Sequence, residues 1–151
     1  MKKLLPKSFK NPQGFTLVEL LVVISIIAIL SVIGITVFTG VQKNARDARR
    51  KGDVQSIQKA LEVHYNDSAC SAVPATPYCA VTAANAAVLF ANGSIPTNPG
   101  PGGAAYTVPA ALSLTYTVCA LLENSTGNYT DAGTTASPTN VGTYYCLKNQ
   151  Q

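Results

Sequence analysis

The feature that most constrains this chain is an uncharged, apolar segment near its N-terminus. Residues 20–42 hold no charged side chain and consist largely of Leu, Val and Ile, interrupted by Ser25, Ser31, Thr36 and Thr39. A helix needs about 20 such residues to cross a bilayer. The hydroxyls are compatible with lipid, because Ser and Thr in a helix can donate to a carbonyl of the preceding turn. We therefore predict a membrane-spanning helix.

A cleaved secretory signal is the competing interpretation of this segment. Such signals combine a basic start with an apolar run of about 7 to 15 residues and a small-residue cleavage site. Residues 20–42 are longer than that, and the sequence after them offers no convincing Ala-x-Ala site. A retained helix is the better interpretation.

Positive charge is concentrated before this segment. The chain has eleven Lys and Arg against seven Asp and Glu, a formal net charge of +4, whereas residues 15–151 sum to zero. The excess lies in four lysines: Lys2, Lys3, Lys7 and Lys10. A nucleic-acid-binding protein spreads basic residues over its folded body, so we expect no nucleic-acid partner. Only four of the 86 residues in 66–151 are charged, so we expect neither catalysis nor a metal or other cofactor.

One acidic residue, Glu19, stands at the start of the apolar segment. At the centre of a bilayer an acid costs about 2.5 to 3.5 kcal/mol on insertion scales, and such residues often mark function. The alternative is a position near the interface, where the helix dipole favours an anion at the N-terminus.

Residues 13–24 read Gln-Gly-Phe-Thr-Leu-Val-Glu followed by apolar residues. This string, after a basic leader, resembles the type IV pilin superfamily, which includes the pseudopilins of type II secretion and competence systems. In that family a prepilin peptidase cuts after the Gly, and the new N-terminal residue, usually Phe, is N-methylated. The resemblance implies that Gly14 precedes the cut, that Phe15 is the methylated terminus and that Glu19 is the family's characteristic acid.

The resemblance also implies a role for Glu19 in assembly. The amine of Phe15, freed by cleavage, would neutralise the Glu19 carboxylate of a neighbouring subunit in an apolar filament core. A subunit in the wrong register would leave a buried charge unpaired, which is costly. A contact between Phe15 and Glu19 of the same subunit is the alternative.

Membrane orientation follows from the resemblance more than from charge. The family places the leader in the cytoplasm, and four leader lysines agree. However, residues 42–53 carry five basic side chains against two acids, so the positive-inside rule is nearly balanced between the flanks.

After residue 42 the helix pattern becomes amphipathic. Apolar residues recur mostly at three- and four-residue steps: Val41, Ala45, Ala48, Val54, Ile57, Leu61 and Tyr65. We predict one helix from about residue 16 to 64, supported by i,i+4 pairs of Asp47 with Lys51 and of Arg49 with Asp53. The charged run is predicted to be a solvated face. Contacts with lipid headgroups before assembly, or with acids of a neighbour afterwards, are the alternatives.

Residues 66–151 have the pattern of a small β-sheet. Pro and Gly make residues 94–105 a loop, and alternating side chains predict strands at 112–120 and 141–147, with a shorter one at 106–108. An antiparallel sheet packed on the polar half of the helix would make an α+β fold. This is also the head that the pilin resemblance implies. Residues 95–100 weakly resemble a loop of major pseudopilins, with Asn98 where those often have Asp.

All four cysteines lie in this region: Cys70, Cys79, Cys119 and Cys146. An oxidising compartment would give two disulfides, for which three pairings exist. We favour Cys70 with Cys79, which closes a short loop, and Cys119 with Cys146, which joins the two strong strands. The second pair also resembles the disulfide-bounded C-terminal region of many type IV pilins. Zinc binding is the alternative, but no Cys-x-x-Cys occurs and the one histidine, His64, lies on the predicted helix.

Other candidate residues have simpler explanations. Four Asn-x-Ser/Thr triplets, beginning at Asn66, Asn92, Asn124 and Asn128, are attributed to a composition rich in Ser, Thr and Asn. His64 has no assignable nucleophile and is not predicted to be a base. Four tyrosines of the head are candidates for ligand contact, although packing is their commoner use: Tyr78, Tyr129, Tyr144 and Tyr145. The calcium site of major pseudopilins is not expected, because few acids lie near the C-terminus.

Four segments are therefore predicted: a leader (1–14), a transmembrane and assembly helix (15–41), its amphipathic continuation (42–65) and a disulfide-bonded head (66–151). The resemblance implies a prepilin, held in the inner membrane with its leader in the cytoplasm and later part of an extracellular or periplasmic filament. Its partners would be membrane lipid before assembly, the prepilin peptidase, an inner-membrane assembly platform with a cytoplasmic ATPase, copies of itself and related minor pilins. The alternatives are a type II secretion pseudopilin and a membrane-anchored adhesin or DNA-binding minor pilin.

Overall fold

The computed structural model of the chain describes residues 14–70, 75–100, 104–132 and 138–151. The leader prediction falls almost wholly on residues 1–13, which lie outside this range, as do residues 101–103 of the predicted loop. The chain divides into two compact units, one ending at Thr39 and one running from Gly40 to Gln151.

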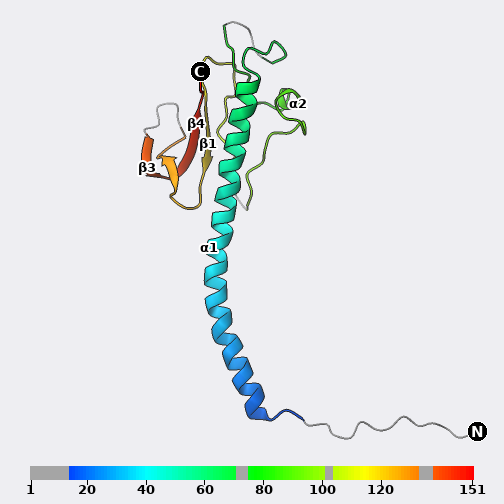
Figure 1. Cartoon of the computed structure of the whole chain (residues 1–151), viewed down its shortest axis with the longest axis vertical. Helices are drawn as coiled ribbons and strands as arrows, with labels where there is room; N and C mark the ends of the chain where they lie inside the picture. The colour runs from blue at the N-terminus through cyan, green and yellow to red at the C-terminus, as the bar shows by residue number, and fades with distance from the viewer. Residues whose placement is uncertain (1–13, 71–74, 101–103, 133–137) are drawn as a thin grey trace, which may run out of the picture. The chain divides into compact units, whose positions relative to one another are not determined.

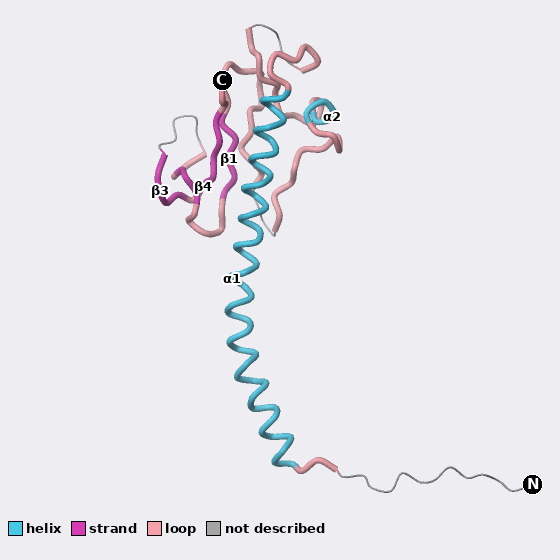
Figure 2. Tube along the Cα trace, viewed as in Figure 1, coloured by secondary structure: helices cyan, strands magenta, loops and turns pink. Residues whose placement is uncertain are grey.

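One long helix, α1 (Leu17–Val63), contributes residues to both units. Its residues 17–39 belong to the first unit, and its residues 40–63 belong to the second. The prediction of a single helix over residues 16–64 is confirmed within one residue at each end. In the second unit α1 lies between the β-sheet on one side and a short helix, α2 (Ala86–Leu89), with its loops on the other (Figures 1 and 2). The fold is α+β, as predicted.

The sheet has four strands, β1 (Thr117–Leu121), β2 (Gly127–Tyr129), β3 (Pro138–Gly142) and β4 (Tyr144–Lys148), in the order β1-β4-β2-β3. All three pairings are antiparallel. The pairing of β1 with β4 sets Cys119 directly opposite Cys146. The backbone of Cys119 bonds outward to Thr107 in both directions, at 2.9 Å, so the two cysteines form a non-hydrogen-bonded pair, the closer type in such ladders.

The strand predictions were right in kind but wrong in extent. The strand predicted at 112–120 begins only at Thr117, because residues 109–113 bond instead to the segment around Tyr78 and Val81. Leu112 and Leu114 are consequently exposed rather than buried.

Two further strand predictions need correction. The strand predicted at 141–147 is two strands, β3 and β4, separated at Thr143, and the one predicted at 106–108 is a single bridge between Thr107 and Cys119. Strand β2 and helix α2 were not predicted. Their three and four residues are too short to display a period.

The core lies where the second half of α1 meets the sheet and its loops. Val54, Ile57 and Leu61 are fully buried and follow the i, i+3, i+7 spacing of one helical face. They pack against residues from the rest of the unit: Tyr78, Cys79, Val81, Leu89, Tyr106, Tyr116, Val118 and Ala120. The predicted apolar stripe is therefore correct from residue 54 onward and wrong before it, since Val41, Ala45 and Ala48 are exposed.

Between the exposed apolar residues of α1 and its buried residues from Val54 onward lies an ion-pair network, formed by Arg46, Asp47, Arg50 and Glu123. Asp47 and Arg50 are only 4% and 3% exposed, and Arg50 Nη1 lies 2.7 Å from Asp47 Oδ1 and 2.9 Å from Glu123 Oε1. Arg46 donates to both oxygens of Glu123, at 2.6 and 2.5 Å. Asp47 also accepts the backbone N–H groups of Glu123 and Asn124, both at 2.9 Å. The network thus ties the β1–β2 turn to the helix.

The network also holds the loop that precedes Tyr106. Arg50 donates to Asn98 Oδ1 at 2.7 Å and to the Pro99 carbonyl at 3.0 Å, while Asn98 Nδ2 donates to the Ala104 carbonyl at 2.6 Å. An aspartate at 98 could not make the last bond, which explains the amide at this position. Gly100 has φ +114°, and a Cβ there would lie 2.8 Å from Arg46 Cδ, so glycine is required.

These contacts correct the prediction of a solvated charged face. Asp47 pairs with Arg50 rather than Lys51, and Lys51 donates to the carbonyl of Thr126 at 3.2 Å. Asp53 accepts from the Tyr106 hydroxyl rather than from Arg49. The predicted i,i+4 pairs are therefore wrong, because loops distant in sequence cover this side of the helix.

The network makes stability depend on pH in the acidic range. The hydrogen bonds from Arg46 lower the pKa of Glu123 to about 2. For Asp47 burial raises the pKa, but bonds from two backbone N–H groups and Arg50 outweigh it, so its pKa lies below the ordinary value. Folded pKa values below the unfolded ones of about 4 mean that both carboxylates stabilise the fold above pH ~4 and lose that effect as pH falls towards 2.

We expect the urea midpoint of the full chain in detergent to fall steadily between pH ~4.5 and ~2.5. The Glu123→Gln variant should have a lower urea midpoint at pH ~4.5, and that midpoint should fall less over this interval, because residue 123 then has no carboxylate to protonate. Lys59→Gln, an exposed substitution, should keep the wild-type slope. An equal slope in wild type and Glu123→Gln would contradict the assignment.

Asn128 completes the strand pairing with its side chain. Its Oδ1 accepts the Cys146 N–H at 2.7 Å, and its Nδ2 donates to the Cys146 carbonyl at 2.8 Å. The Nδ2 of Asn124 is bonded as well, to Asn44 and Asp47. The Nδ2 groups of Asn124 and Asn128 are therefore both engaged within the fold.

Asn128→Ala is expected to lower the free energy of unfolding by about 1 to 3 kcal/mol, because both backbone groups of Cys146 lose their partner. Asn128→Asp keeps the acceptor and loses the donor, so its free energy of unfolding should lie between those of wild type and Asn128→Ala. Chemical denaturation of the three proteins in the same detergent tests this, and an Asn128→Ala variant as stable as wild type would refute it.

Candidate processing and assembly site

The first helical residue is Leu17, and the residue before it caps the helix. Thr16 Oγ1 accepts the backbone N–H of Glu19 at 3.2 Å, and a Glu19 carboxylate oxygen accepts the Thr16 backbone N–H at 2.8 Å and its hydroxyl at 2.7 Å. This reciprocal arrangement is a capping box, which satisfies donors that helix geometry leaves without partners. The Thr-x-x-Glu spacing that signals it was present in the sequence but was not interpreted.

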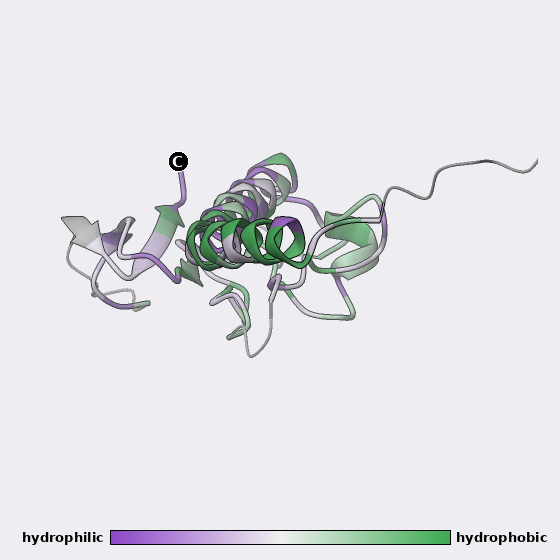
Figure 3. Cartoon of the chain, turned by 90° about the horizontal axis from the view of Figure 1, so that it is seen from below, coloured by the Kyte–Doolittle hydropathy of each residue, from purple (hydrophilic) through white to green (hydrophobic). Residues whose placement is uncertain are grey.

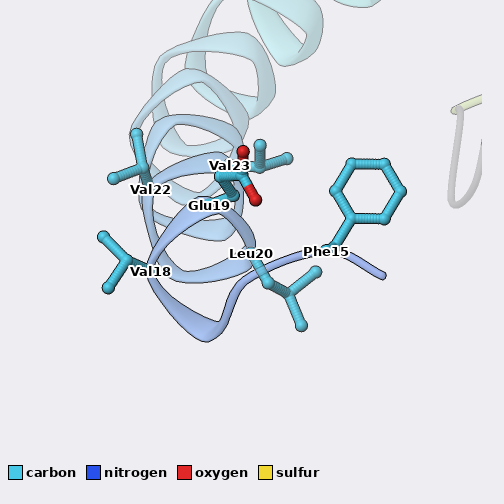
Figure 4. A pocket seen from close by; sticks show the side chains of 6 residues that line it. All are labelled: Phe15, Val18, Glu19, Leu20, Val22 and Val23. Carbon is cyan, nitrogen blue, oxygen red and sulfur yellow. The ribbon is translucent and has the colours of Figure 1, made fainter. Parts of the chain in front are cut away.

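The capping box decides how Glu19 is held within one chain. Its carboxylate turns back to Thr16, and no hydrogen bond joins it to Phe15 in the described part of the chain. Figure 4 shows the Phe15 ring projecting from the segment before the helix, on the opposite side of this view from Val18 and Val22. In this uncut chain the Phe15 nitrogen is part of a peptide bond, so its pairing with Glu19 stays a prediction for the cleaved subunit.

Phe15 and the start of α1 are strongly exposed. Phe15 is 91% exposed, and the large apolar side chains from Leu17 to Val41 are each 47% or more exposed. Figure 3 shows apolar residues all around this part of the helix. Among the described residues, α1 is the helix long and apolar enough to cross a membrane, and its most apolar stretch is not buried within the chain. A surface of this size requires a bilayer or other chains to cover it.

The polar side chains of this segment are satisfied by the helix itself, as predicted. Ser25, Ser31, Thr36 and Thr39 each donate to a backbone carbonyl three or four residues earlier, at 2.7 to 2.9 Å. They therefore present no free donor to a lipid environment.

Gly14, the residue before the expected cut, is exposed, and a Cβ built there would have no atom within 4 Å. Its surroundings therefore leave the Gly14–Phe15 bond open to an enzyme. That this bond is cut stays a prediction.

The four cysteines form two pairs in the structure, Cys70 with Cys79 and Cys119 with Cys146. Their Cα atoms are 5.2 and 4.1 Å apart. Each bond of this kind contributes about 2 to 4 kcal/mol to a small domain. Among the described residues there is no group of three or more His, Cys, Asp and Glu side chains placed to hold a metal.

The remaining candidates serve the fold. Tyr78 is 1% exposed and packs edge-to-face against Tyr65 and Tyr116, and Tyr129 is 8% exposed. His64 Nδ1 lies 2.7 Å from Asp67 at the end of the helix. Of the four tyrosines considered for ligand contact, only Tyr144 and Tyr145 are partly accessible.

Comparison with known proteins bears on the N-terminal part of the chain. Residues 9–35 match the family model described as the prokaryotic N-terminal methylation motif. No curated protein and no solved structure matches the chain. The matched segment contains the Gly-Phe junction, the capping box and the first half of the exposed apolar helix. The chain therefore carries the N-terminal methylation motif that is the signature of type IV pilins and pseudopilins.

Proposed function

We propose that this chain is a prepilin, the precursor of a structural subunit in a type IV pilus-like filament. A peptidase removes residues 1–14, Phe15 becomes the N-methylated terminus, and residues 15–41 anchor the subunit in the membrane and later pack in the filament. The observation that carries the proposal is the methylation motif on a helix whose apolar surface is exposed on all sides. The division of the chain at residues 14, 41 and 65 is part of the proposal.

A surface pilus is favoured over a secretion pseudopilus by the head. Residues 66–151 contain two disulfides and only four charged side chains, features suited to a subunit that must persist outside the cell. The carboxylate oxygens of Glu123 accept from Arg46 and Arg50, and those of Asp47 accept from Arg50 and from N–H groups of Glu123 and Asn124, so they are not free to bind a calcium ion. A retained anchor with a ligand-binding head is less favoured, because Tyr78 and Tyr129 are buried.

The proposal is tested by co-expressing the chain with a prepilin peptidase and an assembly platform, shearing the cells and measuring the intact mass of the chain. We expect filaments built from a chain that starts at methylated Phe15. Gly14→Leu should leave the leader in place and give no filaments. A wild-type chain that stays in the membrane with residues 1–14 intact would overturn the proposal, and a short periplasmic filament would favour the pseudopilin.

A further inference from the structure

Acidic and basic side chains of the second unit differ in whether they have partners within the chain. Five of the six acidic residues after residue 42 have partners for their carboxylates within the chain: Asp47, Asp53, Glu62, Asp67 and Glu123. The sixth, Asp131, also has a contact within the chain. The acidic residues of the described part of this unit are therefore all engaged in contacts within the chain.

The seven cations after residue 14 divide into two groups. Four have internal partners: Arg46 and Arg50 in the ion-pair network, Lys51 with Thr126 and the Tyr145 ring, and Lys148 over the Tyr129 ring. The other three are exposed and make no hydrogen bond or ion pair with any described residue: Lys43, Arg49 and Lys59. Asp53 and Glu62 keep their negative charge, because they bond to neutral groups, whereas Lys43, Arg49 and Lys59 have neither a hydrogen-bond nor an ion-pair partner among the described residues.

The three free cations lie at different distances from the apolar segment. Lys43 follows residue 42 directly, and Arg49 is six residues or about 9 Å farther along α1, whereas Lys59 is about 24 Å from Lys43. The polar headgroups add about 5 to 8 Å to each side of a bilayer's hydrocarbon core. Long basic side chains extend towards that layer from neighbouring helix positions. Lys43 and Arg49 are within its reach, and Lys59 is not.

We propose that Lys43 and Arg49 bind the phosphate groups of anionic phospholipids at the membrane face from which the head emerges. The ion-pair network determines which cations are available to lipid, because it engages Arg46 and Arg50 and leaves Lys43 and Arg49 free. The proposal rests on the proposed function only in treating the chain as a membrane-anchored precursor. DNA is a poorer partner, since two cations on one helix neutralise few phosphates of a duplex.

The test measures lipid preference on the uncut, unassembled chain, so it does not depend on cleavage or filament formation. All proteins carry Gln in place of the leader lysines, which removes anionic-lipid binding at the other membrane face. The chain is placed in bilayer discs of phosphatidylcholine with phosphatidylglycerol, and the retained lipids are counted by native mass spectrometry. Each cation at an anionic surface is expected to raise the preference for phosphatidylglycerol about fivefold.

Lys43→Gln and Arg49→Gln should each lower the preference about fivefold, and the double variant about 30-fold. Lys59→Gln is the matched control and should leave it unchanged. Higher salt should weaken the wild-type preference, because exposed charges are screened. An unchanged preference in the double variant, or an equal loss in Lys59→Gln, would overturn the proposal. So would tight binding of a short DNA duplex that the double variant loses.

Discussion

Replacing Arg50 by methionine is expected to lower the free energy of unfolding by about 3 to 5 kcal/mol. Arg50 is 3% exposed and supplies the counter-charge and one hydrogen bond of Asp47, while also donating to Asn98 and the Pro99 carbonyl. Methionine has similar length but leaves the Asp47 carboxylate buried with only backbone and amide donors. The loss is a large part of the stability of a domain this small.

The chain offers a matched control for this experiment in the adjacent residue. Arg49 is the same residue type on the same helix but is exposed and unpaired among the described residues, so Arg49→Met should change stability by no more than about 0.5 kcal/mol. Arg50→Lys keeps the charge and loses the planar guanidinium with its several donors, so its stability should lie between those of wild type and Arg50→Met. Urea denaturation of the full chain in detergent, followed by tyrosine near-ultraviolet dichroism, measures all three. Equal midpoints for Arg49→Met and Arg50→Met would refute the role of the network.

Replacing Glu19 by valine is expected to leave insertion, cleavage and methylation intact and to reduce filament yield more than about tenfold. In the proposed filament the freed Phe15 amine of a neighbour would then lie unpaired in an apolar core. An uncompensated buried charge costs about 3 to 5 kcal/mol, and each 1.4 kcal/mol is a factor of ten. Sheared filament yield and the intact mass of the chain are the two measurements.

The capping box requires a second pair of variants, because Glu19 also accepts hydrogen bonds from Thr16. Glu19→Gln keeps an acceptor for the cap but removes the charge, and should assemble as poorly as Glu19→Val. Thr16→Ala removes the cap at about 0.5 to 2 kcal/mol of helix stability but keeps the charge, and should still assemble. Normal filaments from Glu19→Gln would show that Glu19 acts through capping, which would rule out the charge-pairing role.

Much of the fold was predictable because its signals are local. The uncharged run, its hydroxyls and the amphipathic spacing from Val54 to Leu61 depend on residues within a few helical turns, and α1 has the predicted bounds. The capping box, which was not predicted, is equally local, because its signal is the Thr-x-x-Glu spacing of Thr16 and Glu19. Strand alternation at 112–120 was also local, but it cannot say which segment is the partner, and residues 109–113 pair with the chain around Tyr78 rather than with the sheet.

The candidate site divides in the same way. The membrane-spanning length, the Gly14–Phe15 junction, the acid four residues later and the near neutrality of everything after the leader can all be read from the sequence. Which charges remain at the surface depends instead on the tertiary fold. Arg46 and Arg50 are neutralised by Asp47 on the same helix and by Glu123, more than seventy residues away. Arg49 is left free, because the loops that cover one side of α1 reach Arg46 and Arg50 and do not reach Arg49. The spacing of residues within the helix does not indicate where those loops lie, because they come from distant parts of the sequence.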